Sequence, residues 1–185
     1  AGLGCGGFSR IGQGTGKSDA NSISIIRKAL DLGVNFIDTS PYYGRTESEI
    51  VLGKALGTVN RNQYYLATKV GRYDLQNFDF TANCVIEIVD QSLTRLNTDY
   101  IDVYLVHWPD RRIPFDEPMR AMEDIVQEGK ARFVGVSNFQ SSEIEECMAA
   151  RRGEAEVSGR GELGMSVPSG CVALVSFNAS TIQLL

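Results

Sequence analysis

The strict alternation of helix-like and strand-like segments between residues 19 and 150 constrains this chain more than any other feature. Each short apolar run of strand length is followed by apolar residues at helical spacing. The expected strands are 34–38, 64–68, 100–106 and 133–136, with one more in the glycine-rich start, 1–18. Strands that alternate with helices require right-handed crossovers and predict a parallel sheet. We therefore expect an α/β fold of about five β/α units.

The helices between these strands have recognisable ends. Asp19 is expected to cap the first helix, and Gly33 suits its end because glycine adopts the left-handed conformation there. Asp116 is expected to cap a later helix that stops at Gly129. The other helices are expected at 47–56, from about Thr81 to Leu96, and from Ser141 or Ser142 onward.

The last part of the chain, 153–185, differs in character from the rest. It holds five glycines and five serines and has no charged residue after Glu162. Only the segment from Cys171 to Phe177 resembles a strand. We therefore expect a domain over 1–152 and a disordered tail over 153–185.

Charge and cysteine content narrow the possible partners. The net charge of −5 argues against a nucleic-acid or anionic-membrane partner, because phosphate binding needs clustered lysine and arginine. No apolar run approaches the ~20 residues of a membrane span. The four cysteines, with His107 as the only histidine, offer no metal-ligand spacing and favour reduced thiols in the cytoplasm. The cysteines are Cys5, Cys84, Cys147 and Cys171.

Two glycine patterns near the start invite a nucleotide-binding interpretation. Residues 2–7 satisfy the dinucleotide fingerprint, but almost nothing precedes them to form the strand that the fingerprint requires. Residues 14–18 resemble the end of a P-loop, except that Ile11 stands where the first glycine belongs. A P-loop nucleotide-binding module remains an alternative, and it requires ATP binding that is lost in Lys17→Ala.

Four ionisable side chains occur at equivalent places in successive units. Asp38, Lys69 and His107 each follow an expected strand at its carboxyl end, and Tyr43 lies in the loop after Asp38. Each alone has an ordinary structural explanation, such as a turn cap or a solvated strand end. In a parallel barrel, however, the carboxyl ends of the strands share one rim, where active sites lie. Their convergence therefore favours an active site.

Four motifs around these residues resemble the signatures of the aldo-keto reductases. The motifs are Phe36–Gly44 followed by Glu47, Ala67–Lys69, Val106–Asp110 and Gly135–Phe139. The resemblance covers about residues 1–152 and implies a (β/α)8 TIM-barrel fold, incomplete after the fifth unit. Residues 71–73 and 78–81 resemble more particularly the branch that includes plant L-galactose dehydrogenase.

The resemblance implies an NAD(P)H-dependent oxidoreductase that interconverts a carbonyl and an alcohol in an aldehyde, ketone or sugar. Tyr43 would be the general acid, and Lys69 would lower the pKa of its phenol, which is ordinarily ≈ 10. Asp38 would pair with Lys69. His107 would hydrogen-bond the carbonyl oxygen, and Trp108 would form an apolar wall of the substrate site.

The family also implies a cofactor, with NADPH favoured over NADH. Ser137 and Asn138 match the pair that hydrogen-bonds the nicotinamide carboxamide. Gly7 and Phe8 would line the nicotinamide ribose, which Asp38 would also touch. Beyond the cofactor, the expected partner is a small carbonyl compound or sugar, and the oligomeric state is not indicated.

The sequence departs from the family after Arg152. A (β/α)8 barrel usually takes ~250 residues, and its last three units hold the loops that grip the cofactor phosphates. Nothing in 153–185 resembles those units, and an open sheet leaves two unpaired edges. Two hypotheses therefore stay open: a carbonyl reductase or sugar dehydrogenase, and a catalytically inactive truncated remnant that binds NADPH weakly or not at all.

Overall fold

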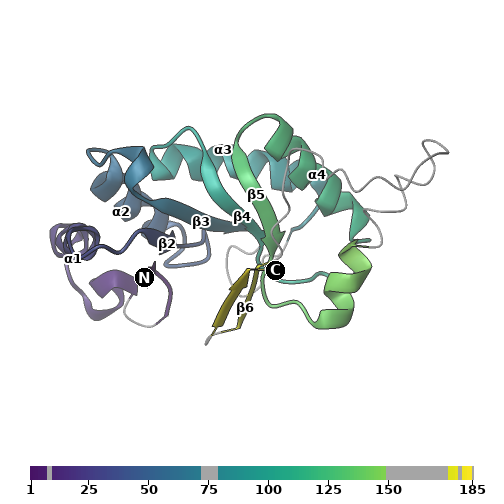
Figure 1. Ribbon diagram of the computed structural model, residues 1–185, viewed down its shortest axis with the longest axis horizontal. Coiled ribbons are helices and arrows are strands. Elements are labelled where there is room, and N and C mark those ends of the chain that lie inside the picture. The colour runs from purple at the N-terminus through teal and green to yellow at the C-terminus, as the bar shows by residue number, and fades with distance from the viewer. Residues whose placement is uncertain (8–9, 72–78, 149–174, 179–180, 185) are drawn as a thin grey trace.

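Five parallel strands form the central sheet of the computed structural model (Figure 1). The structure describes residues 1–7, 10–71, 79–148, 175–178 and 181–184. The strands lie side by side in chain order: β1 (Gly2–Gly4), β2 (Phe36–Asp38), β3 (Tyr65–Val70), β4 (Ile101–Val106) and β5 (Ala131–Val136). This is the winding of consecutive units of a (β/α)8 barrel, so the expected α/β architecture is confirmed.

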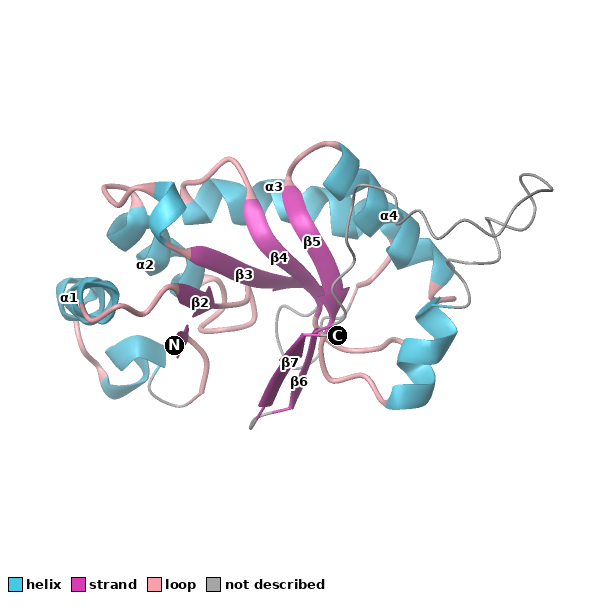
Figure 2. Ribbon diagram, in the orientation of Figure 1, coloured by secondary structure: helices cyan, strands magenta, loops and turns pink. Residues whose placement is uncertain are grey.

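Helices connect the strands and cover one face of the sheet, as α2, α3 and α4 do in Figure 2. The α-helices are α1 (Asp19–Asp31), α2 (Glu47–Leu56), α3 (Ala82–Leu96) and α4 (Asp116–Gln127), and residues 141–148 are also helical. Two short 3-10 helices are η1 (Arg10–Thr15) and η2 (Arg61–Gln63). The buried side chains form two clusters, one around Leu52 and Leu66 and one around Tyr104 and Met122.

The strand ladder continues one residue beyond several strands. The backbone N–H groups of Thr39, His107 and Ser137 donate to the carbonyl oxygens of the neighbouring strand at 2.8 to 3.0 Å. These bonds fix the first residue after β2, β4 and β5. Because all strands run the same way, those residues lie on one rim of the sheet.

Two helix starts differ from the prediction. Ser18, rather than Asp19, is the N-cap of α1, and its Oγ accepts a hydrogen bond from Asn21 N at 3.4 Å. Asp116 is the first residue of α4, whose N-cap residue, Phe115, makes no side-chain hydrogen bond. Both carboxylates instead lie in the first turn, where they face the positive end of the helix dipole.

The tail is not wholly without regular structure. Strands β6 (Val175–Asn178) and β7 (Thr181–Leu184) pair antiparallel, and β6 overlaps the predicted strand that ends at Phe177. This hairpin lies beside β5, with which β6 is in contact (Figure 1). The expected disorder of the preceding segment, 153–174, falls outside the described residues.

Helices α2 and α3 pack at close range through Gly53. A Cβ at this position would lie 2.1 Å from Arg95 O. We expect Gly53→Ala to destabilise the chain by about 1–3 kcal/mol, because the helix backbones must separate. This is opposite in sign to the gain that alanine gives over glycine in an open helix. Urea unfolding measures the difference.

The control for Gly53→Ala is Ser24→Ala. Ser24 lies on the exposed face of α1, where alanine should be neutral or slightly stabilising. Equal stability of Gly53→Ala and the wild-type protein would show that α2 and α3 do not depend on this contact.

Candidate active site

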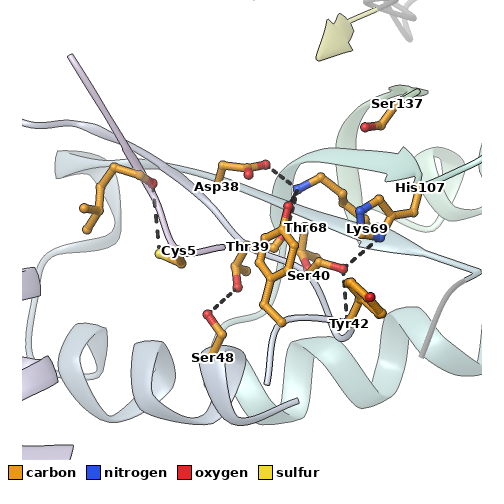
Figure 3. Close-up of polar contacts among 12 residues, drawn as sticks. Cys5, Asp38, Thr39, Ser40, Tyr42, Ser48, Thr68, Lys69, His107 and Ser137 are labelled. Atoms are coloured by element: carbon orange, nitrogen blue, oxygen red, sulfur yellow. Dashed lines mark hydrogen bonds and ion pairs between the residues drawn. The ribbon is translucent and has the colours of Figure 1, made fainter. Parts of the chain in front are cut away.

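Lys69 and Asp38 form an ion pair at the carboxyl ends of β3 and β2 (Figure 3). Lys69 Nζ donates to Asp38 Oδ1 at 2.6 Å, with the lysine side chain 2% exposed and the aspartate side chain 18% exposed. The strand register pairs Asp38 with Ala67, two residues before Lys69, so the two charged side chains lie on the same face of the sheet. A buried ammonium needs such a partner, since an unpaired one is strongly destabilising.

The Lys69 ammonium has two more acceptors in the loop after β2. Nζ donates to Thr39 O at 2.7 Å and to the Tyr43 hydroxyl at 3.3 Å. An ammonium has three N–H donors. Asp38, Thr39 and Tyr43 together provide one acceptor for each of them. The structure therefore brings together Asp38, Tyr43 and Lys69, as the sequence analysis expects.

Burial dominates the electrostatics of Tyr43. It raises the pKa of the phenol above its usual value, against the lowering effect of the Lys69 charge and hydrogen bond, while Asp38 adds to the rise. Lys69 thus lowers the pKa of Tyr43 as expected, but burial outweighs its effect, which charge-based sequence reasoning does not include. Burial, followed by the Asp38 charge, also raises the pKa of the nearby Cys5 thiol to about 12.

His107 lies next to this cluster, with aromatic rings around it. Its ring stacks on Trp108 with centroids 3.9 Å apart and 31° between planes, and it meets the Tyr43 ring edge-on at 5.9 Å. The Nδ1 atom is 3.0 Å from Ser40 Oγ (Figure 3). All four predicted catalytic side chains thus lie at one rim, and Ser40 is a contact that the sequence analysis missed.

A second buried network supports β3 from the helix side. The Glu49 carboxylate, fully buried on α2, accepts hydrogen bonds from Thr68 Oγ1 at 2.6 Å and from Arg95 Nε at 2.7 Å. Ser92 Oγ contacts the same carboxylate at 3.4 Å. The network connects α2, β3 and α3 through Thr68, the residue that precedes Lys69 on β3. Its signal in the sequence is an acidic residue inside the apolar helix 47–56.

The predicted cofactor residues at the end of β5 lie beside His107. Asn138 Nδ2 donates to His107 O at 2.8 Å and contacts Ser137 Oγ at 3.2 Å. Asn138 adopts a left-handed conformation with φ 61°, which asparagine tolerates better than most residues. Gly7, with φ 77°, follows the end of β1, and an added Cβ there would meet nothing within 4 Å. Phe8 lies outside the described residues.

Neither glycine pattern has the context that nucleotide binding requires. Residues 2–4 of the first pattern form β1 itself, and the described residues after it open the 3-10 helix η1 rather than an α-helix. The P-loop-like residues 14–18 begin within η1 and lead into α1, with no buried strand directly before them.

A cavity of about 530 Å³ lies at the opposite end of the strands from the ion pair, between the end of α1 and the segment before β3. Among the described residues there is no helix long and apolar enough to cross a membrane. The same part of the chain holds no group of three or more potential metal ligands.

Comparison with known proteins decides the family. A sequence profile of the Aldo/keto reductase family matches residues 2–158. The chain belongs to this family. The matched segment extends six residues past the expected end of the domain at 152.

Two curated relatives are each 41% identical to the chain in sequence. It is 41% identical over 151 residues to "Aldo-keto reductase YhdN" of Bacillus subtilis, covering 74% of this chain and 45% of the relative. It is 41% identical over 131 residues to L-galactose dehydrogenase of Arabidopsis thaliana, covering 66% and 40%. The chain therefore spans less than half the length of these relatives.

Solved aldo-keto reductases share the fold. The enzyme AKR11C1 from Bacillus halodurans aligns with a TM-score of 0.70 and 34% identity, over 80% of this chain and 49% of that one. An aldo-keto reductase from Klebsiella pneumoniae in complex with NADPH aligns with a TM-score of 0.67 and 32% identity, over 78% and 47%. The five parallel strands thus correspond to an incomplete (β/α)8 barrel.

Proposed function

We propose that this chain carries the catalytic residues of an NAD(P)H-dependent oxidoreductase that interconverts a carbonyl and an alcohol. The main support is the Lys69 ammonium, which hydrogen-bonds Asp38 and the Tyr43 hydroxyl at once. A bound reduced nicotinamide supplies hydride to the carbonyl carbon, and the protein must then supply one proton to the carbonyl oxygen.

Tyr43 is the proton donor in this proposal. Its oxygen accepts from Lys69 Nζ at 3.3 Å, so the phenolic hydrogen points away from the ammonium and is available to a substrate. Burial keeps the phenol protonated at neutral pH, since it raises the pKa. As the proton leaves, the phenolate forms beside the ammonium, which stabilises it. Asp38 keeps that ammonium charged and aimed.

His107 and Trp108 form the substrate end of the site. The His107 and Tyr43 rings lie close together and nearly perpendicular to each other. A single carbonyl oxygen can therefore be reached from both side chains. His107 hydrogen-bonds this oxygen and fixes the orientation of the carbonyl. The Trp108 ring, stacked on His107, gives an apolar surface that suits the carbon skeleton of an aldehyde, ketone or sugar.

The residues beside His107 fit a nicotinamide. A carboxamide both donates and accepts hydrogen bonds, and the Ser137 hydroxyl and Asn138 amide can complement it. The Asn138 amide is already oriented by its bonds to His107 O and Ser137 Oγ. NADPH is the proposed cofactor, supported by the Klebsiella pneumoniae relative in complex with NADPH. The units that hold the phosphate-gripping loops of the family have no recognisable counterpart in residues 153–185, so the proposal concerns the nicotinamide end of the cofactor.

Oxidation of NADPH with 4-nitrobenzaldehyde, followed by absorbance, tests the proposal. We expect turnover above the rate without protein, and faster turnover with NADPH than with NADH. Oxidation of L-galactose with NADP+ tests the branch suggested by residues 71–73 and 78–81. If NADPH is not consumed above background, the proposal fails and the inactive-remnant hypothesis takes its place.

Gly6 leaves the space that the Tyr43 ring occupies. A Cβ at Gly6 would lie 2.8 Å from the ring carbon Cζ. Gly6→Ala should therefore displace the phenol and lower kcat by about 10- to 100-fold, since a 1 Å misplacement can cost 10²-fold. The measurement is the NADPH assay, with circular dichroism to verify folding.

The matched control is Gly4→Ala, two residues earlier on β1. An added Cβ there would meet nothing within 4 Å, so the substitution should leave kcat unchanged. Equal activities of Gly6→Ala and Gly4→Ala would show that the position of the Tyr43 ring does not limit turnover.

A further inference from the structure

Ser40 is a fully buried side chain that contacts the imidazole of His107. Its Oγ lies 3.0 Å from His107 Nδ1, and the histidine is only 2% exposed (Figure 3). The proposed proton transfer does not use the Ser40 hydroxyl. Its place beside the imidazole nevertheless bears on which ring nitrogen carries the hydrogen.

The hydrogen bonds of Ser40 can be assigned by counting hydrogens. The backbone N–H of Tyr42 donates to Ser40 Oγ at 3.1 Å, and a serine hydroxyl has a single hydrogen of its own. In the described part of the chain, Tyr42 N and His107 Nδ1 are the two polar partners of Oγ. The Ser40 hydrogen therefore has one acceptor available, which is Nδ1 when that nitrogen carries no hydrogen.

The opposite arrangement leaves a hydrogen unpaired. If Nδ1 carried the hydrogen, it would donate to Ser40 Oγ, and the Ser40 hydroxyl hydrogen would be buried without an acceptor. Buried polar hydrogens in native proteins are almost always paired, because an unpaired one keeps its full desolvation penalty. The arrangement with Ser40 as donor and Nδ1 as acceptor pairs the Ser40 hydrogen, the Tyr42 N–H and the Nδ1 lone pair.

We propose that Ser40 holds the neutral His107 ring in the tautomer with its hydrogen on Nε2. The ring then presents a donor, not a lone pair, on the side away from Ser40. The assignment of that donor to a carbonyl oxygen rests on the proposed function, whereas the tautomer itself does not. Ser40 is thus a positioning residue that acts through His107.

Contacts other than the one with Ser40 hold His107 in place, so the position of the ring and its tautomer can be tested separately. The ring is held by stacking on Trp108, and the backbone is held by bonds to Val70 O at 3.0 Å and from Asn138 Nδ2 at 2.8 Å. Loss of the Ser40 hydroxyl therefore leaves the ring in place and changes mainly which nitrogen carries the hydrogen. With a lone pair on Nε2, the ring would repel the negative charge that develops on a carbonyl oxygen during hydride transfer.

Because His107 is the only histidine in the sequence, NMR of protein labelled with ¹⁵N-histidine reports on this ring alone. At a pH where the ring is neutral, we expect Nδ1 to resonate as an unprotonated nitrogen and Nε2 as a protonated one. In Ser40→Ala the share of the Nδ1–H form, relative to the Nε2–H form, should rise about three- to tenfold, the effect of one net hydrogen bond. Ser40→Thr, which retains the hydroxyl, should restore the wild-type spectrum.

Two results would overturn this assignment. One is a wild-type spectrum with Nδ1 protonated, which decides the matter even where a variant does not fold. The other is an unchanged tautomer ratio in folded Ser40→Ala.

Kinetics separate this inference from the proposed function. In the NADPH assay, Ser40→Ala should lower kcat about tenfold with little change in KM, and Ser40→Thr should recover it. If neither the wild-type protein nor the variants reduce the aldehyde, but the tautomer ratio changes in Ser40→Ala, the proposed function fails and the tautomer assignment stands. If the aldehyde is reduced but the tautomer ratio is the same in Ser40→Ala, only the tautomer assignment fails.

Discussion

Tyr43→Phe should lower kcat for NADPH-dependent reduction by about 10²- to 10⁴-fold, the usual contribution of a positioned general acid. The substitution removes only the hydroxyl that lies 3.3 Å from Lys69 Nζ. Asp38 and Thr39 still hold the ammonium, so the fold and the ion pair should persist. Single-turnover measurements with saturating NADPH isolate the chemical step, and circular dichroism verifies the fold.

The control for Tyr43→Phe is Tyr65→Phe. Tyr65 begins β3, the strand that carries Lys69, and its side chain is 54% exposed, so its hydroxyl should not affect turnover. Because burial raises the pKa of Tyr43, the wild-type rate should be constant through neutral pH and should fall only in the alkaline range, where the phenol ionises. Activity of Tyr43→Phe within threefold of wild type would rule out the phenol as the acid.

Arg95→Met should lower the free energy of unfolding by about 3–5 kcal/mol, the cost of leaving a buried carboxylate without its partner. Glu49 is fully buried and bonds Arg95 Nε at 2.7 Å, whereas Arg95 itself is 17% exposed. Methionine retains much of the apolar stem of arginine, so the loss reflects the charge and hydrogen bonds more than packing. Urea unfolding at neutral pH measures it.

Lys54→Met provides the comparison for a surface ion pair. Lys54 and Asp19 are 2.7 Å apart, with side chains 51% and 48% exposed, so removal of the lysine should change stability little. The double variant Arg95→Met with Glu49→Leu should recover much of the loss, since no charge then remains buried. An effect of Arg95→Met no larger than that of Lys54→Met would mean that solvent reaches the Glu49 carboxylate.

The sequence was sufficient to predict the five strands of the parallel sheet and to single out all four ionisable residues, but not to predict β7. Apolar runs end at Asp38, Lys69 and His107, and a parallel sheet brings such ends to one rim. Tyr43 was singled out by its place in the loop after Asp38, and the family resemblance then implied its role as the acid. Strand β3 runs to Val70, two residues beyond the predicted end, since pairing with β4 continues to Val106.

Ser40 and Glu49 escaped prediction for a different reason. Ser40 meets His107 across 67 positions of the chain, and Glu49 meets Arg95 across 46. Such contacts depend on side chains from separate units, which local patterns do not specify. The raised pKa of Tyr43 escaped for a related reason, because desolvation is a property of the packed site.

The two neighbours Thr68 and Lys69 use opposite faces of β3, one reaching Glu49 among the helices and the other Asp38 at the rim. A slip of this strand by one residue would exchange the two faces. The ammonium would then face the helices, where Glu49 already has Arg95 as its partner, and Asp38 would lose its counter-charge. A misaligned β3 would therefore lose two buried interactions at once, the Thr68–Glu49 hydrogen bond and the Lys69–Asp38 ion pair. The order of these two neighbouring residues thus favours the strand register in which the site forms.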